Sequence, residues 1–137
     1  MIADKITSLT KIISPIIGGA VGFCFGEATG VFIALASFMI ADYISGVLAA
    51  INDKNLSSKI GFIGISKKIA ILIMVAIANI LDVKVLQADG ILRTAVIFFY
   101  LANEGLSILE NIGRLGLPIP KKISDTLKQL GQEEDNE

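Results

Sequence analysis

Apolar residues along this chain are gathered into four long stretches that short polar segments separate. The stretches are Ile12–Gly26, Ala28–Ile51, Ile69–Leu86 and Ile91–Gly113. A helix needs about 20 apolar residues to cross roughly 30 Å of hydrocarbon. The second stretch is long enough and contains one charged residue, Asp42. A helix of a soluble bundle would instead show a polar stripe along its length. The pattern predicts an all-α membrane protein with about four transmembrane helices.

Lysine and arginine residues flank these stretches unevenly. Ten of the twelve lie before the first stretch, between the second and third, or after the fourth: Lys5, Lys11, Lys54, Lys59, Lys67, Lys68, Arg114, Lys121, Lys122 and Lys128. Because short loops rich in Lys and Arg remain cytoplasmic, both termini are expected in the cytoplasm. We therefore expect a transmembrane domain over residues 1–113 and a cytoplasmic segment over 114–137.

The first stretch is the weakest of the four. Ser14-Pro15 is typical of a helix start, and a helix from there to the end of the stretch would rise only about 18 Å. The preceding residues Ile2–Ile13 show the spacing of an interfacial helix. We therefore expect a thin, kinked or conditionally inserted first span. A three-span alternative remains, but it would leave the two N-terminal lysines outside.

Small residues recur at intervals of four in the first two stretches. One row holds Gly18, Gly22 and Gly26, and the other holds Ala41, Ser45 and Ala49. On a helix this spacing aligns a surface that a second helix can approach closely. We expect both rows in helix packing, either within one subunit or between subunits. Residues 26–30 predict a tight outer turn that joins the first two helices into a hairpin.

Polar residues lie inside the spans as well. A charge at the centre of a membrane helix costs about 2.5–3.5 kcal/mol, so Asp42 and Glu104 are expected to face protein or water. Glu104 belongs to a stripe within a roughly 120° arc of its helix, made of Arg93, Tyr100, Asn103, Glu104, Ser107, Glu110, Asn111 and Arg114. The stripe predicts the wall of an aqueous lesion or a seam between subunits, with Asp42, Asn103, Glu104, Ser107 and Asn111 as candidates. The alternative is a contact within one subunit, for example between Glu104 and Asn79.

Other features limit the chemistry. The chain has no histidine, which excludes a Ser-His-Asp relay and a His-ligated metal centre. The single Cys24 leaves no disulfide framework and no thiolate metal site. The net charge of −1 gives no reason to expect a nucleic-acid partner. We expect no enzymatic activity, no metal and no cofactor.

The C-terminal region is less apolar than the four long stretches. After Pro120 the sequence predicts a short amphipathic segment with Ile123, Leu127 and Leu130 on one side. Its lysines are expected to face anionic lipid of the inner leaflet. The last five residues, 133–137, predict a solvated acidic tail.

Three segments of the chain resemble holins of the toxin-secretion/phage-lysis family. They are residues 42–50 (DYISGVLAA), residues 58–68 (SKIGFIGISKK), and residues 103–111 (NEGLSILEN) followed by 116–122 (GLPIPKK). The resemblance implies a protein that accumulates in the cytoplasmic membrane of a Gram-positive host, oligomerises and opens lesions. An endolysin, or in some relatives a toxin, would leave the cell through them.

The residues leave other functions open. A small ion or proton channel, or a transporter, could use the same two carboxylates. A holin inhibitor (antiholin) would suit a first span that inserts only conditionally. A membrane anchor for a partner protein is the fourth reading, and it would depend on the charged tail.

Overall fold

The computed structural model describes residues 1–132, and these form helices without strands. The elements are α1 (Ile2–Phe25), α2 (Gly30–Asn52), α3 (Ser58–Ile80), the π-helical turn η1 (Leu81–Leu86), α4 (Ile91–Arg114) and α5 (Lys121–Gln132). Four of the helices are long and apolar enough to cross a membrane: α1, α2, α3 continued by η1, and α4. The predicted all-α class and the four candidate spans are therefore confirmed.

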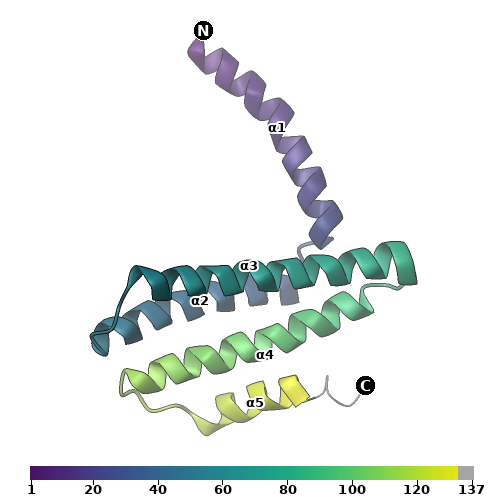
Figure 1. Ribbon diagram of the computed structural model, residues 1–137. Coiled ribbons are helices and arrows are strands. Elements are labelled where there is room, and N and C mark those ends of the chain that lie inside the picture. The colour runs from purple at the N-terminus through teal and green to yellow at the C-terminus, as the bar shows by residue number, and fades with distance from the viewer. Residues whose placement is uncertain (133–137) are drawn as a thin grey trace.

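Helices α2, α3 and α4 form a three-helix bundle in which α4 is the central element (Figure 1). Their shared core consists of Leu35, Met39, Ile71, Val75, Ile97 and Leu101. The outer faces of α2 and α3 are also apolar, since side chains such as Ile40, Leu48 and Ile73 are at least half exposed. A bundle that is apolar both inside and outside is typical of helices surrounded by lipid.

Side-chain caps set where α2 and α3 begin. The hydroxyl oxygens of Thr29 and Ser57 accept hydrogen bonds from the amides of Phe32 and Ile60, as N-cap residues do. Because α3 begins at Ser58, well before the apolar stretch from Ile69, the prediction of a basic loop up to residue 68 was wrong. The three lysines at positions 59, 67 and 68 are helical residues of α3.

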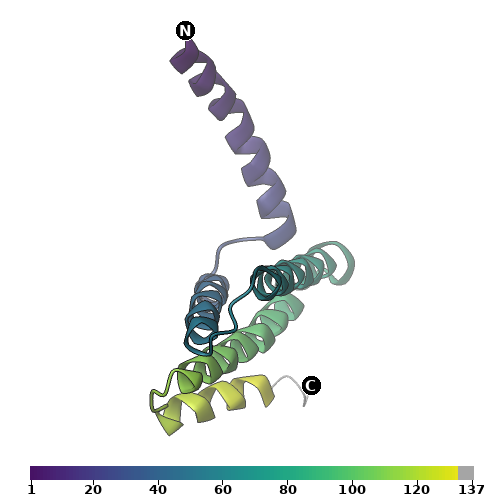
Figure 2. The same cartoon turned by 60° about the vertical axis from the view of Figure 1, so that its left-hand side comes forward.

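Helix α1 stands apart from the bundle. It runs without interruption through Pro15, so the predicted helix start at Ser14-Pro15 was wrong. In this setting Pro15 removes one backbone hydrogen bond from a continuous helix. Figure 2 shows α1 projecting away from the other helices, and none of its residues is buried.

The predicted hairpin of the first two helices was also wrong. Helix α1 packs against α3, and its contact with α2 is confined to its last residue, Phe25, whose ring lies 5.7 Å from that of Phe32. Gly26 ends α1 with φ of 71°, a bend follows at Glu27, and the backbone of Thr29 is extended where it caps α2. Gly26 itself lies against α3, where a Cβ atom would be 2.8 Å from Asn79 Oδ1. A larger residue at this position would clash with Asn79, so glycine allows the end of α1 to approach α3 closely.

Helix α5 folds back along α4, as Figure 1 shows. The predicted amphipathic segment is thus a helix, and its buried residue is Leu127. Leu130 is partly buried, whereas Ile123 is 49% exposed and contributes little to this contact. The predicted acidic tail lies outside the described residues.

Candidate functional site: an ion cluster inside the bundle

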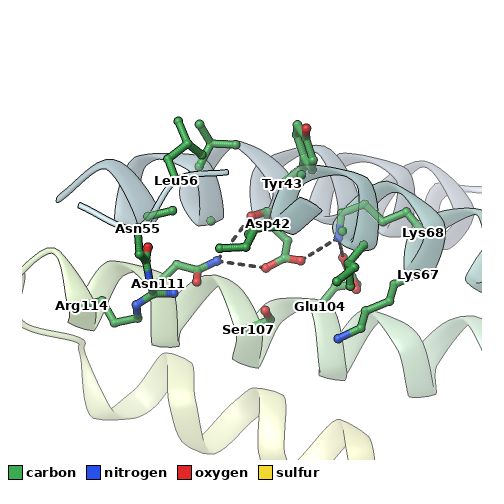
Figure 3. A pocket seen from close by; sticks show the side chains of 17 residues that line it. Asp42, Tyr43, Asn55, Leu56, Lys67, Lys68, Glu104, Ser107, Asn111 and Arg114 are labelled. Atoms are coloured by element: carbon green, nitrogen blue, oxygen red, sulfur yellow. Dashed lines mark hydrogen bonds and ion pairs between the residues drawn. The ribbon is translucent and has the colours of Figure 1, made fainter. Parts of the chain in front are cut away.

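Three charged side chains meet at the centre of the three-helix bundle, one from each helix. Lys68 Nζ of α3 lies 2.6 Å from Asp42 Oδ2 of α2 and 2.8 Å from Glu104 Oε2 of α4. The exposed fractions of the three side chains are only 10–15%. Figure 3 shows the lysine between the two carboxylates. We call these three residues the ion cluster.

Asn111 holds the Asp42 side of the cluster in place. Asn111 lies about two turns after Glu104 on α4. Its Nδ2 atom is 3.1 Å from Asp42 Oδ1 and 3.1 Å from Ser45 Oγ. The same nitrogen is 3.3 Å from the Asp42 carbonyl oxygen. Each Asp42 carboxylate oxygen thus accepts a hydrogen bond, one from Lys68 and one from Asn111. Buried charges persist in proteins when they are paired and hydrogen-bonded in this way.

The ion cluster lies about half way along the helices. At 1.5 Å per residue, Asp42 is roughly 16 Å from Asp53 along α2, and Glu104 is about 15 Å from Arg114 along α4. Half of a hydrocarbon layer of about 30 Å is the same distance. A cluster of two negative charges and one positive charge is therefore placed at mid-membrane depth when these helices span a bilayer.

A cavity of about 590 Å³ extends from the ion cluster to the connection between α2 and α3. Its wall includes all three cluster residues and, nearer the end of the bundle, Asn55, Leu56 and Arg114 (Figure 3). Lys67 and Ser107 also line it. The cavity can hold water next to the charges, which reduces the free energy needed to keep them inside the bundle.

An ion pair joins α2 to α4 at this end of the bundle. Asp53 Oδ2 accepts hydrogen bonds from Arg114 Nε at 2.9 Å and from Arg114 Nη2 at 2.7 Å. The hydrogen bonds from this guanidinium group lower the pKa of Asp53 below its ordinary value of 3.8. Asn52 Nδ2 adds a hydrogen bond to the Arg114 carbonyl oxygen.

A second group of polar residues joins the elements at the opposite end. The carboxylate of Asp82, which is fully buried, accepts hydrogen bonds from the amides of Leu92 and Arg93 in the first turn of α4. Arg93 Nη2 in turn donates to the Glu27 carbonyl oxygen at 2.7 Å. Asn79 Nδ2 donates to the Phe23 carbonyl oxygen. These contacts attach the α1–α2 connection and the end of α1 to the bundle.

Some residues of the predicted polar stripe on α4 are buried in the structure, and others are exposed. Arg93, Glu104 and Asn111 are buried against the other helices, while Asn103 and Glu110 are exposed. The suggested pairing of Glu104 with Asn79 was wrong, because Lys68 is the partner of Glu104 and Asn79 bonds to the end of α1. Sequence reasoning missed Lys68 because it assigned this residue to a loop. The helix cap at Ser57, followed by apolar residues from Ile60, is the signal that could have placed it inside a span.

The two rows of small residues have different surroundings. Ser45 and the buried Ala49 lie on the part of α2 that packs against α4, while Ala41 is exposed. Gly18 and Gly22 of α1 have no side-chain atom within 4 Å of the position of an added Cβ. The row on α2 thus contributes to packing within the subunit. In the row on α1, Gly26 lies against Asn79 of α3, whereas Gly18 and Gly22 have no partner within the described subunit.

No cluster of three or more metal-ligating side chains occurs among residues 1–132. The site therefore consists of ion pairs, amides and a cavity of about 590 Å³ inside apolar helices. Together with four candidate spans, this defines a small multi-pass membrane protein with a charged group in its interior.

Comparison with known proteins identifies the family. The sequence profile of the bacteriophage holin family matches residues 19–132. A probable holin of Bacillus phage phi105 is 35% identical over 113 residues, which cover 82% of this chain and 82% of that protein. An uncharacterized protein of Listeria innocua is 50% identical over 110 residues, 80% of this chain and 78% of its own length. This chain belongs to the bacteriophage holin family.

Other relatives are similar over a comparable length. An uncharacterized 14.9 kDa protein of Clostridium perfringens, located in the nagH 3' region, is 42% identical over 77% of this chain and 80% of its own. No solved structure matches the chain. Family membership points to a membrane protein without enzymatic activity, as the sequence analysis expected, and it suggests assembly in the membrane and a role in lysis.

Proposed function

We propose that this protein is a holin that accumulates in the cytoplasmic membrane of a bacterial host, assembles with copies of itself and opens lesions. An endolysin, or a toxin in a secretion system, would leave the cell through these lesions. The observation that carries the proposal is the ion cluster, which lies about half way along helices long enough to span a bilayer, in a chain of the holin family. The lysines near the N-terminus, Lys54 in the connection between α2 and α3, and Arg114 at the end of α4 support a cytoplasmic position for both termini.

The ion cluster gives the single subunit a way to remain inserted without a lesion. Within one chain, Lys68 and Asn111 satisfy the two carboxylates, so a subunit does not need a second copy to bury them. Three polar residues of the α4 stripe stay exposed, and of these Arg114 pairs with Asp53, which leaves Asn103 and Glu110. In this proposal they meet other copies or water, and α1 adds its unpartnered glycine face to the contact. Assembly would then grow with protein density in the membrane.

The test is inducible expression in a bacterium together with a muralytic enzyme that lacks its own export signal. We expect depolarisation of the membrane and release of the enzyme at a defined time after induction. Glu104→Leu should delay or abolish release because it removes half of the cluster's negative charge. Asp89→Leu, a change to an exposed carboxylate outside the cluster, is the matched control and should act like the parent protein. Normal growth at high membrane levels of the parent protein would contradict the proposal.

A small ion or proton channel is the second candidate, and the cavity that reaches the ion cluster favours it. It predicts flux of ions with no passage of folded protein. Release of dyes of increasing size from proteoliposomes separates the two functions, since a lesion passes large dyes and a channel does not. An antiholin would instead delay lysis when it is expressed beside an active holin.

A further inference from the structure

Helix α5 lies against the middle of α4, on the face formed by Ala102 and Gly105. A Cβ atom added to Gly105 would lie 2.7 Å from Leu127 Cδ2, so the leucine occupies the space that a larger side chain would take. One turn further along α5, a Cβ atom added to Gly131 would lie 3.5 Å from Ala102 Cβ. The residue numbers rise along α5 as they fall along α4. The two helices are therefore antiparallel.

The charged residues at both ends of α4 define where α5 lies relative to a bilayer. Arg93 and Arg114 are about 32 Å apart along the helix, close to the roughly 30 Å thickness of the hydrocarbon. Measured from Arg114, Gly105 is about 14 Å and Ala102 about 18 Å along the helix axis. When α4 spans the membrane in this register, the contacts of α5 reach from the interface to the middle of the bilayer.

The outward face of α5 is polar. Leu127 is buried against α4, while Lys122, Asp125, Lys128 and Gln129 are exposed. Lipid does not accept such a face at this depth, because charged side chains inside the membrane turn toward protein or water. Segments that enter a membrane without crossing it occur where protein buries them or where they line a water-filled cavity.

We propose that α5 is a re-entrant helix whose polar face lines the aqueous lumen of the assembled lesion. The proposal rests on the proposed holin function and adds the lumen-lining element to it. It replaces the sequence-based expectation that this segment lies on the cytoplasmic surface. The apolar side of α5 stays on α4 through Leu127 and Gly105, and the lysines and amides of the other side contact water.

The position of α5 is tested first by a disulfide. Ala102→Cys with Gly131→Cys, in a Cys24→Ser background, places two thiols at a Cβ separation that suits a disulfide. In oxidised membranes we expect this pair to cross-link. The matched control, Asn103→Cys with Gly131→Cys, moves one thiol to the neighbouring exposed position and should not cross-link. Absence of the 102–131 cross-link would overturn the proposal, and this readout needs no lesion activity.

The depth of α5 is tested next with a fluorophore attached to Lys122→Cys or to Lys128→Cys in proteoliposomes. Lipids that carry a quencher on the acyl chain should reduce the emission from position 128 more than the emission from position 122. Equal, shallow quenching at both positions would show a surface helix and overturn the proposal.

The lumen is tested in planar bilayers with a charged thiol reagent. Modification of Lys128→Cys should reduce the current through open lesions, whereas modification of Lys59→Cys, an exposed position at the start of α3, should leave it unchanged. An unchanged current in both variants would overturn the lumen assignment. A protein that forms no lesions at all would contradict the holin function, while the cross-link and the depth measurement would still report the position of α5.

Discussion

The ammonium nitrogen of Lys68 lies 2.8 Å from Glu104 Oε2, and the same nitrogen is bound to Asp42, so one positive charge joins three helices. A lysine inside a membrane span is costly by itself. Here it is the partner that makes two carboxylates acceptable inside the bundle. The ion cluster is thus a packing element of the single subunit as well as a polar group in its interior.

Removing the lysine should be the most destabilising change in the cluster. Lys68→Met leaves Asp42 and Glu104 facing each other without a cation, and breaking a buried ion pair in this way costs about 3–5 kcal/mol. The free energy of unfolding in detergent micelles is the measurement. Lys67→Met is the matched control, because the neighbouring Lys67 is exposed and has no ion pair in the structure of residues 1–132. Equal stability of the two variants would contradict the role of Lys68.

Two asparagines of α4 allow a second matched comparison. Asn111→Ala should lower the free energy of unfolding by about 1–3 kcal/mol, because the Asp42 oxygen that it binds is left without a donor. Asn103→Ala should leave stability within about 0.5 kcal/mol of the parent protein, as expected for an exposed side chain. In lysis assays Asn103→Ala is expected to shift the time of lysis. A change in stability from Asn103→Ala equal to that from Asn111→Ala would argue against the division of the stripe.

The carboxylate of Asp82 should be needed for the start of α4. Asp82→Ala removes the acceptor for the Leu92 and Arg93 amides, and loss of a helix cap costs about 0.5–2 kcal/mol. Thermal unfolding in micelles measures the loss, and hydrogen exchange of the two amides should become faster. Asp89→Ala, in the same connection and exposed, should change neither quantity.

The ion pair between Asp53 and Arg114 predicts a dependence on pH. Because the pKa of Asp53 is lowered in the folded protein, the pair contributes to stability above the ordinary value of 3.8 and loses this contribution as pH falls through the lower folded value. We therefore expect thermal stability to decrease in this acidic range, and Asp53→Asn should flatten that part of the profile. An identical profile in Asp53→Asn and the parent protein would show that the pair does not contribute.

The glycine row of α1 gives a test of assembly that is separate from folding. Gly22→Leu meets no atom within 4 Å of the added Cβ, so it should leave the stability of the subunit unchanged. If the row is a contact between copies, this variant should reduce cross-linked oligomers in membranes and delay lysis. Gly19→Leu is the matched control, since Gly19 is equally free of contacts but lies about 60° from Gly22 and about 100° from Gly18 around the helix. Equal effects of the two variants would argue against a specific glycine contact.

The number of candidate spans and their apolar centres could be predicted from the sequence because hydropathy acts locally, whereas the starts of α1 and α3 could not. A run of about 20 apolar residues is stable in hydrocarbon only as a helix, whatever surrounds it. The same local argument placed Asp42 and Glu104 inside the spans and predicted that they would face protein or water. It also predicted the amphipathic helix after Pro120, since the spacing of Leu127 and Leu130 is a property of that segment alone.

Only the tertiary structure decided which polar groups meet. The partner of Glu104, the division of the polar stripe and the place of α5 on α4 depend on how separate helices are aligned and rotated against one another. Residues far apart in the sequence, such as Asp42, Lys68 and Glu104, come together because an unpaired charge in an apolar bundle is costlier than a paired one. Hydropathy along the chain carries no information about that alignment, because lipid and a neighbouring helix are equally apolar surroundings.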